Sequence, residues 1–318
     1  MKKTLVALAV AAVAATSANA AVVYNQDGTK VDVGGSLRLV LEKETDKRAD
    51  LNDNGSRVKV KGTHDLGEGL SALGYVELGF KGDFGSEGVT TRRLYAGFEH
   101  ADIGTLTFGK QLTNADNFGV ADPTYKFGGL WTGHFHDAGN KVIHFASKKY
   151  SGFSFGADYV FGKADKKDVY GNKVAKNDAY ILGAFYDNTY DNGVNVKAEL
   201  GYTYSNVAAN EKSKALKAAL GAGYNGFFLG VDYAQTKVTK KEKNKGFQVG
   251  ASYQVTDMAK LYSAYRQTEQ AKVKTKEFAL GVGYKLHKQV ETFVEYNTSK
   301  LKDAKRNNKV YAGLRVHF

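Results

Sequence analysis

Basic side chains recur at every second position in several segments of the chain. Arg57, Lys59 and Lys61 alternate with Val58 and Val60. In an extended strand the three cations would share one face and the valines the other. A row of guanidinium and ammonium groups attracts and steers anions. The chemistry that these residues suggest is therefore charge selection.

Two further arginines fit the same scheme. Arg38 shares a strand face with Ser36, and Arg93 shares one with Tyr95 and Glu99. Both arginines thus sit on the polar sides of their strands, where they would meet water. A channel that selects ions would carry its charges on such a surface.

The motifs of catalysis and cofactor binding are weak here. Residues 221–226 fit the pattern GxGxxG but span a strand end and a turn, with no helix to receive a phosphate. His134 and His136 have no third ligand nearby in sequence. The chain has no Gly-x-Ser-x-Gly elbow. We therefore expect no enzyme activity, no cofactor and no metal site.

The elements that position the charges are strands. At the C-terminus, Val316 and Phe318 share one parity, whereas Arg315 and His317 share the other. About sixteen segments, from 30–44 to 308–318, show this pattern. Nearly every strand has an apolar side, yet no helices are available to cover it. The pattern predicts an all-β fold, an antiparallel transmembrane β-barrel, over a soluble sandwich or lipocalin-like barrel.

The first residues are typical of a cleaved signal peptide over 1–20. Lys2 and Lys3 precede an apolar stretch, and Ala18-Asn19-Ala20 forms a cleavage site. The barrel domain would then occupy 21–318. Export makes nucleic acid an improbable partner despite the net charge of +12. Without cysteine, the exported chain needs no disulfides.

One connection is much longer than the others. Asn225-Gly226 predicts a tight hairpin turn, whereas residues 111–139 show no strand pattern and hold the only proline and tryptophan. Loops of this length are usually functional or disordered. We expect 111–139 to fold inward as a constriction loop; an exposed loop is the alternative.

Several segments carry a family resemblance. Residues 23–42, 55–80, 92–111, 284–297 and 313–318 resemble successive strands of Gram-negative general diffusion porins, closest to the outer-membrane protein H group. The resemblance implies a homotrimer of sixteen-stranded barrels in the cell outer membrane, each with its third loop folded into the pore. It also implies contact with outer-membrane lipid and passive diffusion of small hydrophilic solutes and ions.

The resemblance assigns candidate residues to the pore constriction. Arg57 matches a wall arginine, Lys110 stands where the family usually has arginine, and Lys141 matches the basic residue after the loop. Strict alternation puts Lys110 on the side of Phe108, so an inward position depends on a bulge or strand end there. With these residues, the basic wall comprises Arg38, Arg57, Arg93, Lys110 and Lys141.

The loop departs from the family pattern. Asp122 matches its first acid, but Lys126 replaces a glutamate and Leu130 an aspartate. Asp116 adds a carboxylate within the same loop, and Asp137 another. With fewer acids and an extra base, we expect weak selectivity that leans towards anions. The alternatives are a solute-specific channel for sugars or nucleotides, and a non-conducting adhesin or enzyme barrel.

Overall fold

The computed structural model describes residues 20–80, 88–167, 176–208 and 210–318. The predicted signal peptide lies outside these ranges except for Ala20. Within these ranges the chain forms eighteen strands and one short 3-10 helix. Their bounds are β1 Ala21–Gln26, β2 Thr29–Glu44, β3 Asp50–Asp53, β4 Arg57–Gly67, β5 Leu70–Phe80, β6 Val89–His100, β7 Gly104–Leu112, η1 Asn114–Asn117, β8 Ala138–Ser147, β9 Phe153–Val160, β10 Ala179–Thr189, β11 Asn195–Ala208, β12 Glu211–Tyr224, β13 Phe227–Val238, β14 Asn244–Gln254, β15 Ala259–Gln270, β16 Val273–His287, β17 Val290–Leu301 and β18 Asn307–His317.

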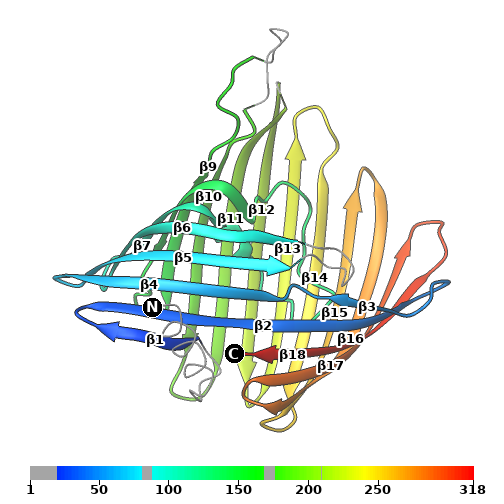
Figure 1. Ribbon diagram of the computed structural model, residues 1–318. Coiled ribbons are helices and arrows are strands. Elements are labelled where there is room, and N and C mark those ends of the chain that lie inside the picture. The colour runs from blue at the N-terminus through cyan, green and yellow to red at the C-terminus, as the bar shows by residue number, and fades with distance from the viewer. Residues whose placement is uncertain (1–19, 81–87, 168–175, 209) are drawn as a thin grey trace.

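The eighteen strands form a closed ring of sixteen positions (Figure 1). Neighbours in sequence pair antiparallel from β4 to β18, and β18 pairs with β2 to close the ring. β1 and β18 lie end to end along one edge of β2, and β3 precedes β4 along the other. The predicted barrel of about sixteen strands is therefore confirmed.

The prediction did not include β1 as a strand. Asp27 and Gly28 both have positive φ, at 52° and 72°. This two-residue turn reverses the chain, so that β1 pairs with the first part of β2. The short hairpin lengthens the wall beyond the C-terminal end of β18.

The two faces of the wall differ as the alternation predicts. On β16, Phe278, Leu280 and Val282 are exposed on the outer face, whereas Ala279 between them is fully buried. Apolar side chains therefore form the outer surface, which meets lipid in a transmembrane barrel. Among the described residues, no helix has both the length and the apolar character needed to cross a bilayer.

Turn geometry distinguishes the two ends of the barrel. Asn225 and Gly226 join β12 to β13 with φ of 48° and 80°, as a tight hairpin requires. The longer connections, such as β13–β14 and β17–β18, lie together at the other end (Figure 1). This arrangement matches short periplasmic turns and longer external loops.

The long connection between β7 and β8 does not extend outward. Residues 113–137 begin with η1 and then lie against the inner face of the wall. Phe118, Leu130 and Phe135 are buried in one cluster with Ile181 of β10 and Ala215 of β12. The predicted inward-folded loop is confirmed, and residues 113–137 are called the constriction loop below.

Candidate functional site

Carboxylates of the wall hold the constriction loop by its main chain. Glu199 of β11 accepts a hydrogen bond from the Gly119 amide at 2.6 Å. Asp232 of β13 accepts the amides of Val120 and Ala121 at 2.9 and 3.1 Å. These amides provide hydrogen bonds to carboxylates that the loop covers.

The far part of the loop is held in the same way. Glu295 of β17 accepts hydrogen bonds from the amides of Tyr125 and Lys126, at 2.8 and 3.1 Å. Its side chain is fully buried, and the Tyr262 hydroxyl donates to it at 3.0 Å. Glu295 therefore fixes the loop and does not present its charge to the water of the lumen.

A buried lysine joins two stretches of the loop. The Lys217 ammonium donates to the carbonyls of Phe118 at 2.5 Å and Leu130 at 2.9 Å. It lies 3.7 Å from the Asp232 carboxylate and 4.7 Å from the centre of the Trp131 ring. Lys217 is 1% exposed, so this cation stabilises the loop and does not face the lumen.

Small residues on the wall allow the loop to approach. A Cβ atom at Gly250 of β14 would lie 2.1 Å from the Ala121 carbonyl oxygen, and one at Gly230 of β13 would lie 2.7 Å from that of Val120. Both distances are shorter than real Cβ contacts. Any larger side chain at these positions would therefore push the loop away from the wall.

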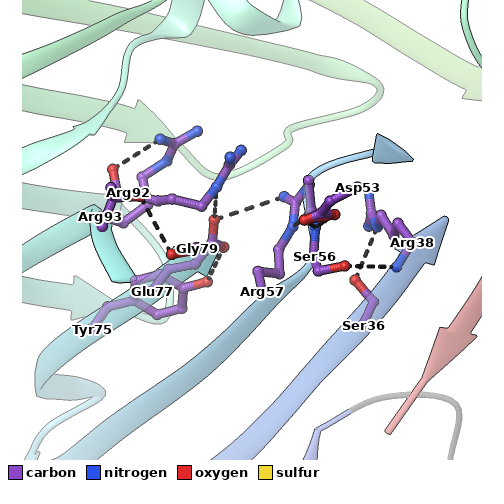
Figure 2. A network of polar contacts seen from close by, with 12 residues as sticks. Ser36, Arg38, Asp53, Ser56, Arg57, Tyr75, Glu77, Gly79, Arg92 and Arg93 are labelled. Atoms are coloured by element: carbon purple, nitrogen blue, oxygen red, sulfur yellow. Dashed lines mark hydrogen bonds and ion pairs between the residues drawn. The ribbon is translucent and has the colours of Figure 1, made fainter. Parts of the chain in front are cut away.

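The water-filled side of the lumen is lined by arginines, and Figure 2 shows their network. Glu77 of β5 is its centre. Its carboxylate lies 2.9 Å from the Arg92 Nε and 3.7 Å from the Arg57 guanidinium. The Tyr75 hydroxyl also donates to it, at 3.1 Å. One carboxylate thus compensates two cations only in part.

Arg38 and Arg93 have no such compensation. The Arg38 Nε donates to the Ser36 hydroxyl at 2.9 Å, and Arg93 donates to the Arg92 carbonyl at 3.0 Å (Figure 2). Arg38 also lies directly opposite Arg315 across the β2–β18 pair. Within the described ranges, no carboxylate lies within 4 Å of Arg38 or Arg93. Both guanidinium groups are therefore not neutralised by a neighbouring carboxylate.

Sequence reasoning missed Arg92 because of a bulge. Strict alternation gives Arg92 and Arg93 opposite faces. In the structure Glu77 pairs with Arg93 and Leu78 pairs with Thr91, so Arg92 is an extra residue in β6. A bulge of this kind redirects a side chain, and here it brings Arg92 to Glu77. Arginine at both positions of a dipeptide was the only signal available in the sequence.

The loop's acids lie beside two different cavities. Asp116 borders a cavity of about 410 Å³ together with Arg57, Arg93 and the stacked rings of Tyr75 and Tyr95. Burial and the nearby Asp137 raise the pKa of Asp116, and Arg93 opposes this shift. Asp122 borders a second cavity, of about 360 Å³, with Lys260 and Arg315. Its carboxylate accepts the Thr124 amide at 3.0 Å.

Lys126 reaches from the loop across to the wall. Its ammonium donates to the Asn54 side chain at 3.1 Å and lies 5.2 Å from the Tyr311 ring centre. Burial lowers the pKa of Lys126, although Glu42 and Glu295 oppose this shift. The loop therefore contributes a cation where the family pattern has an acid.

The structure does not bring Lys110 and Lys141 to the arginines. Lys110 pairs with Leu94, which is exposed on the outer face, and it lies within the register shift of the β7–β8 pair, between Gly109 and Gln111. Lys141 neighbours Val142, which is buried on the inner side, so alternation turns Lys141 away. Its ammonium donates to the Gly162 carbonyl at 2.7 Å. Of the five predicted wall residues, Arg38, Arg57 and Arg93 form the cluster.

The two histidines lie in a turning segment of the loop. His134 and His136 have φ of 53° and 55°, so this segment is not a strand in which the two rings share a face. Phe135 between them is buried in the loop cluster. In the part of the chain that the structure describes, no three His, Asp or Glu side chains are grouped to hold a metal ion.

Comparison with known proteins identifies the family. A family model described as "Gram-negative porin" matches residues 7–304. The chain belongs to the Gram-negative porin family. Over its whole length it is 47% identical to a major outer membrane protein of Pasteurella multocida, and 45% identical to that of strain Pm70; both relatives are covered completely. This porin is thus an outer-membrane diffusion channel and a multi-pass β-barrel.

Solved porins share the fold at low sequence identity. The loop-deletion form of OmpT from Vibrio cholerae has a TM-score of 0.74 at 23% identity, covering 92% of this chain and all of the other. An anion-selective porin from Comamonas acidovorans has a TM-score of 0.73 at 19% identity, covering 91% of this chain and all of the other. At this level of sequence identity, these similarities show a shared barrel fold.

Proposed function

We propose that this porin lets small hydrophilic solutes and ions diffuse passively and prefers anions. The observation that carries the proposal is the charge balance beside the constriction loop. Five guanidinium groups, those of Arg38, Arg57, Arg92, Arg93 and Arg315, outnumber the three carboxylates beside them, those of Glu77, Glu291 and Asp116. A ring with excess positive charge lowers the energy of an anion in the pore.

The loop strengthens this imbalance. Glu199, Asp232 and Glu295 would be acids of the lumen in an empty barrel, but the loop covers them and binds them through its amides. Lys126 adds a cation on the loop itself. Two exposed acids of the loop, Asp116 and Asp122, favour cations in part of the lumen, so the expected anion preference is weak.

The proposal extends to assembly and to the class of activity. One solved neighbour is described as the trimer form of OmpT from Vibrio cholerae, and another as an anion-selective porin. Both descriptions apply to those proteins. For this chain we propose a homotrimer embedded in outer-membrane lipid, acting as a channel and not as an enzyme, adhesin or solute-specific transporter.

Planar-bilayer recording tests the function directly. Purified protein would be inserted one channel at a time under a KCl gradient. We expect ohmic steps, grouped in threes for a trimer, and a reversal potential with the sign of chloride preference. A reversal potential of the opposite sign would overturn the anion preference. Folded, inserted protein without conductance would overturn the open channel.

A further inference from the structure

We propose that the cavity beside Asp116 is a transient binding site for a hydroxylated carboxylate, such as a sugar acid, on its way through the pore. The cavity has a volume of about 410 Å³ and is bordered by side chains of β4–β8 and η1. Its lining includes Glu99, Thr105 and Ala146, which lie close to the short turns that join β6 to β7 and β8 to β9. This inference rests on the proposed diffusion channel and names one class of its solutes.

A buried carboxylate orients one hydrogen-bonding group of the site. The side chain of Asp158 is fully buried and lies 2.5 Å from the His144 Nδ1. It also accepts the main-chain and side-chain amides of Asn114, both at 2.8 Å. Because an ionised carboxylate only accepts, the neutral imidazole carries its proton on Nδ1 and leaves Nε2 as an acceptor. His144 borders the cavity and is 19% exposed, so a solute hydroxyl can donate to it.

Two tyrosine rings give the cavity an apolar face. Tyr75 and Tyr95 stack with their ring centres 4.9 Å apart, so each ring covers one face of the other. The residue opposite Tyr95 on β7 is Gly109, which has no side chain to cover the second face. A Cβ atom there would lie 2.4 Å from the Leu94 carbonyl oxygen. The negative face of an aromatic ring attracts the partly positive C–H groups of a sugar ring.

Arg93 supplies the positive charge of the site. Its guanidinium donates to the Arg92 carbonyl at 3.0 Å and has no ion-pair partner among the described residues. The two wall acids that border the cavity, Glu77 and Glu99, are both paired with cations of the wall. A solute carboxylate can therefore bind Arg93 through a charge-assisted hydrogen bond. Asp116, on the loop side of the cavity, can accept a further hydroxyl.

These three features together favour one class of solute. A carboxylate without hydroxyls would use Arg93 alone, and a neutral sugar would use His144 and the tyrosine rings without Arg93. A sugar acid uses all three. A solute that crosses a channel must also leave its site, so binding has to be weak. The site would retain sugar acids briefly and leave the pore open to other small solutes.

Current recordings in planar bilayers test the proposal with three probes, D-glucuronate, D-glucose and acetate. KCl is equal on both sides, and binding is measured as excess current noise that saturates with probe concentration. Glucuronate makes at least one more polar contact than either other probe. We therefore expect its half-saturating concentration to be about threefold to tenfold lower than theirs, the value of one hydrogen bond.

Single substitutions then assign the contacts. His144→Phe and Tyr95→Leu should each raise the half-saturating glucuronate concentration about threefold to tenfold. Arg93→Gln should abolish the preference for glucuronate over glucose. His287→Phe, exposed in a short turn, is the matched control and should equal wild type. If His144→Phe does not fold, Tyr95→Leu keeps all partners of Asp158 and provides the test.

The outcomes separate this inference from the proposed function. Equal half-saturating concentrations for the three probes, or equal values for wild type and the Tyr95→Leu variant, would overturn the proposal. Ligand-detected NMR of the folded protein in detergent measures the same binding without current, so a failure to conduct would not hide the site. A potassium preference in KCl alone, with glucuronate binding intact, would overturn the ion preference and support the binding site.

Discussion

At the scale of the residue, Arg38 is the side chain on which the proposed anion preference depends most directly. Its guanidinium faces Arg315, hydrogen-bonds only to serine and has no carboxylate partner among the described residues. Such a charge is not cancelled locally, so it acts on ions that pass. The carboxylate of Glu77, by contrast, pairs with Arg57 and Arg92 and neutralises part of their charge.

Replacing Arg38 therefore tests the arginine wall. We expect Arg38→Gln to lower the chloride-to-potassium permeability ratio by a few-fold at most, because one charge at about 4 Å in water contributes about 1 kcal/mol. Reversal potentials under a KCl gradient measure the ratio. Arg48→Gln, in an exposed external loop, is the control and should leave it unchanged. An equal ratio in both variants would contradict the assignment.

We expect Asp116 to make the ion selectivity depend on pH. Burial and Asp137 raise the pKa of Asp116, so it becomes protonated at a higher pH than an ordinary aspartate. Protonation removes a negative charge, and anion preference should therefore increase as the pH falls. At neutral pH, Asp116→Asn should be more anion-selective than wild type. As the pH is lowered, the difference in selectivity between wild type and Asp116→Asn should shrink. Because the pKa of Asp116 is raised, this change should begin above about pH 4, where a free aspartate titrates. A constant difference would contradict the role of this carboxylate.

At the scale of the element, the constriction loop depends on the wall more than on itself. Its amides bind Glu199, Asp232 and Glu295, and its carbonyls bind Lys217. None of these partners is close in sequence. The position of the loop is therefore a property of strands β11–β17, which form its support.

Lys217 is the residue whose loss should disturb the loop most clearly. Lys217→Met removes a buried cation and leaves Asp232 buried beside it, which costs about 3–5 kcal/mol when a buried pair is broken. We expect noisier open-channel current and a lower thermal stability of the barrel.

Adding Asp232→Asn should recover part of both losses, since the amide oxygen can still accept from Val120 and Ala121 while the unpaired charge disappears. Single-channel noise and thermal unfolding measure the effects. A quiet, stable Lys217→Met channel would show that the loop does not need this cation.

At the scale of the whole molecule, the sequence predicted the ring well because alternation is a local signal that repeats. The sixteen expected segments correspond to the sixteen positions of the barrel, and the break in the rhythm at 111–139 located the inward loop. Local patterns also placed Arg57 and Arg93 on the inner face.

The sequence could not show contacts that join distant strands. The hydrogen bond from Gly119 to Glu199 links residues 80 positions apart, and no periodicity marks it. The bulge at Arg92 was invisible for a related reason, since register arises from the pairing of two strands. The assignment of Lys110 and Lys141 to the pore wall came from the family resemblance. The alternation of side chains along the strands does not support it.

The way the wall holds the loop has a consequence for evolution and engineering. Glu199, Asp232 and Glu295 bind main-chain N–H groups, which every residue except proline possesses. The loop side chains that face water therefore contribute little to holding the loop against the wall. Mutations can exchange these side chains to suit new solutes while the loop keeps its place, so the constriction can change one side chain at a time within the same backbone.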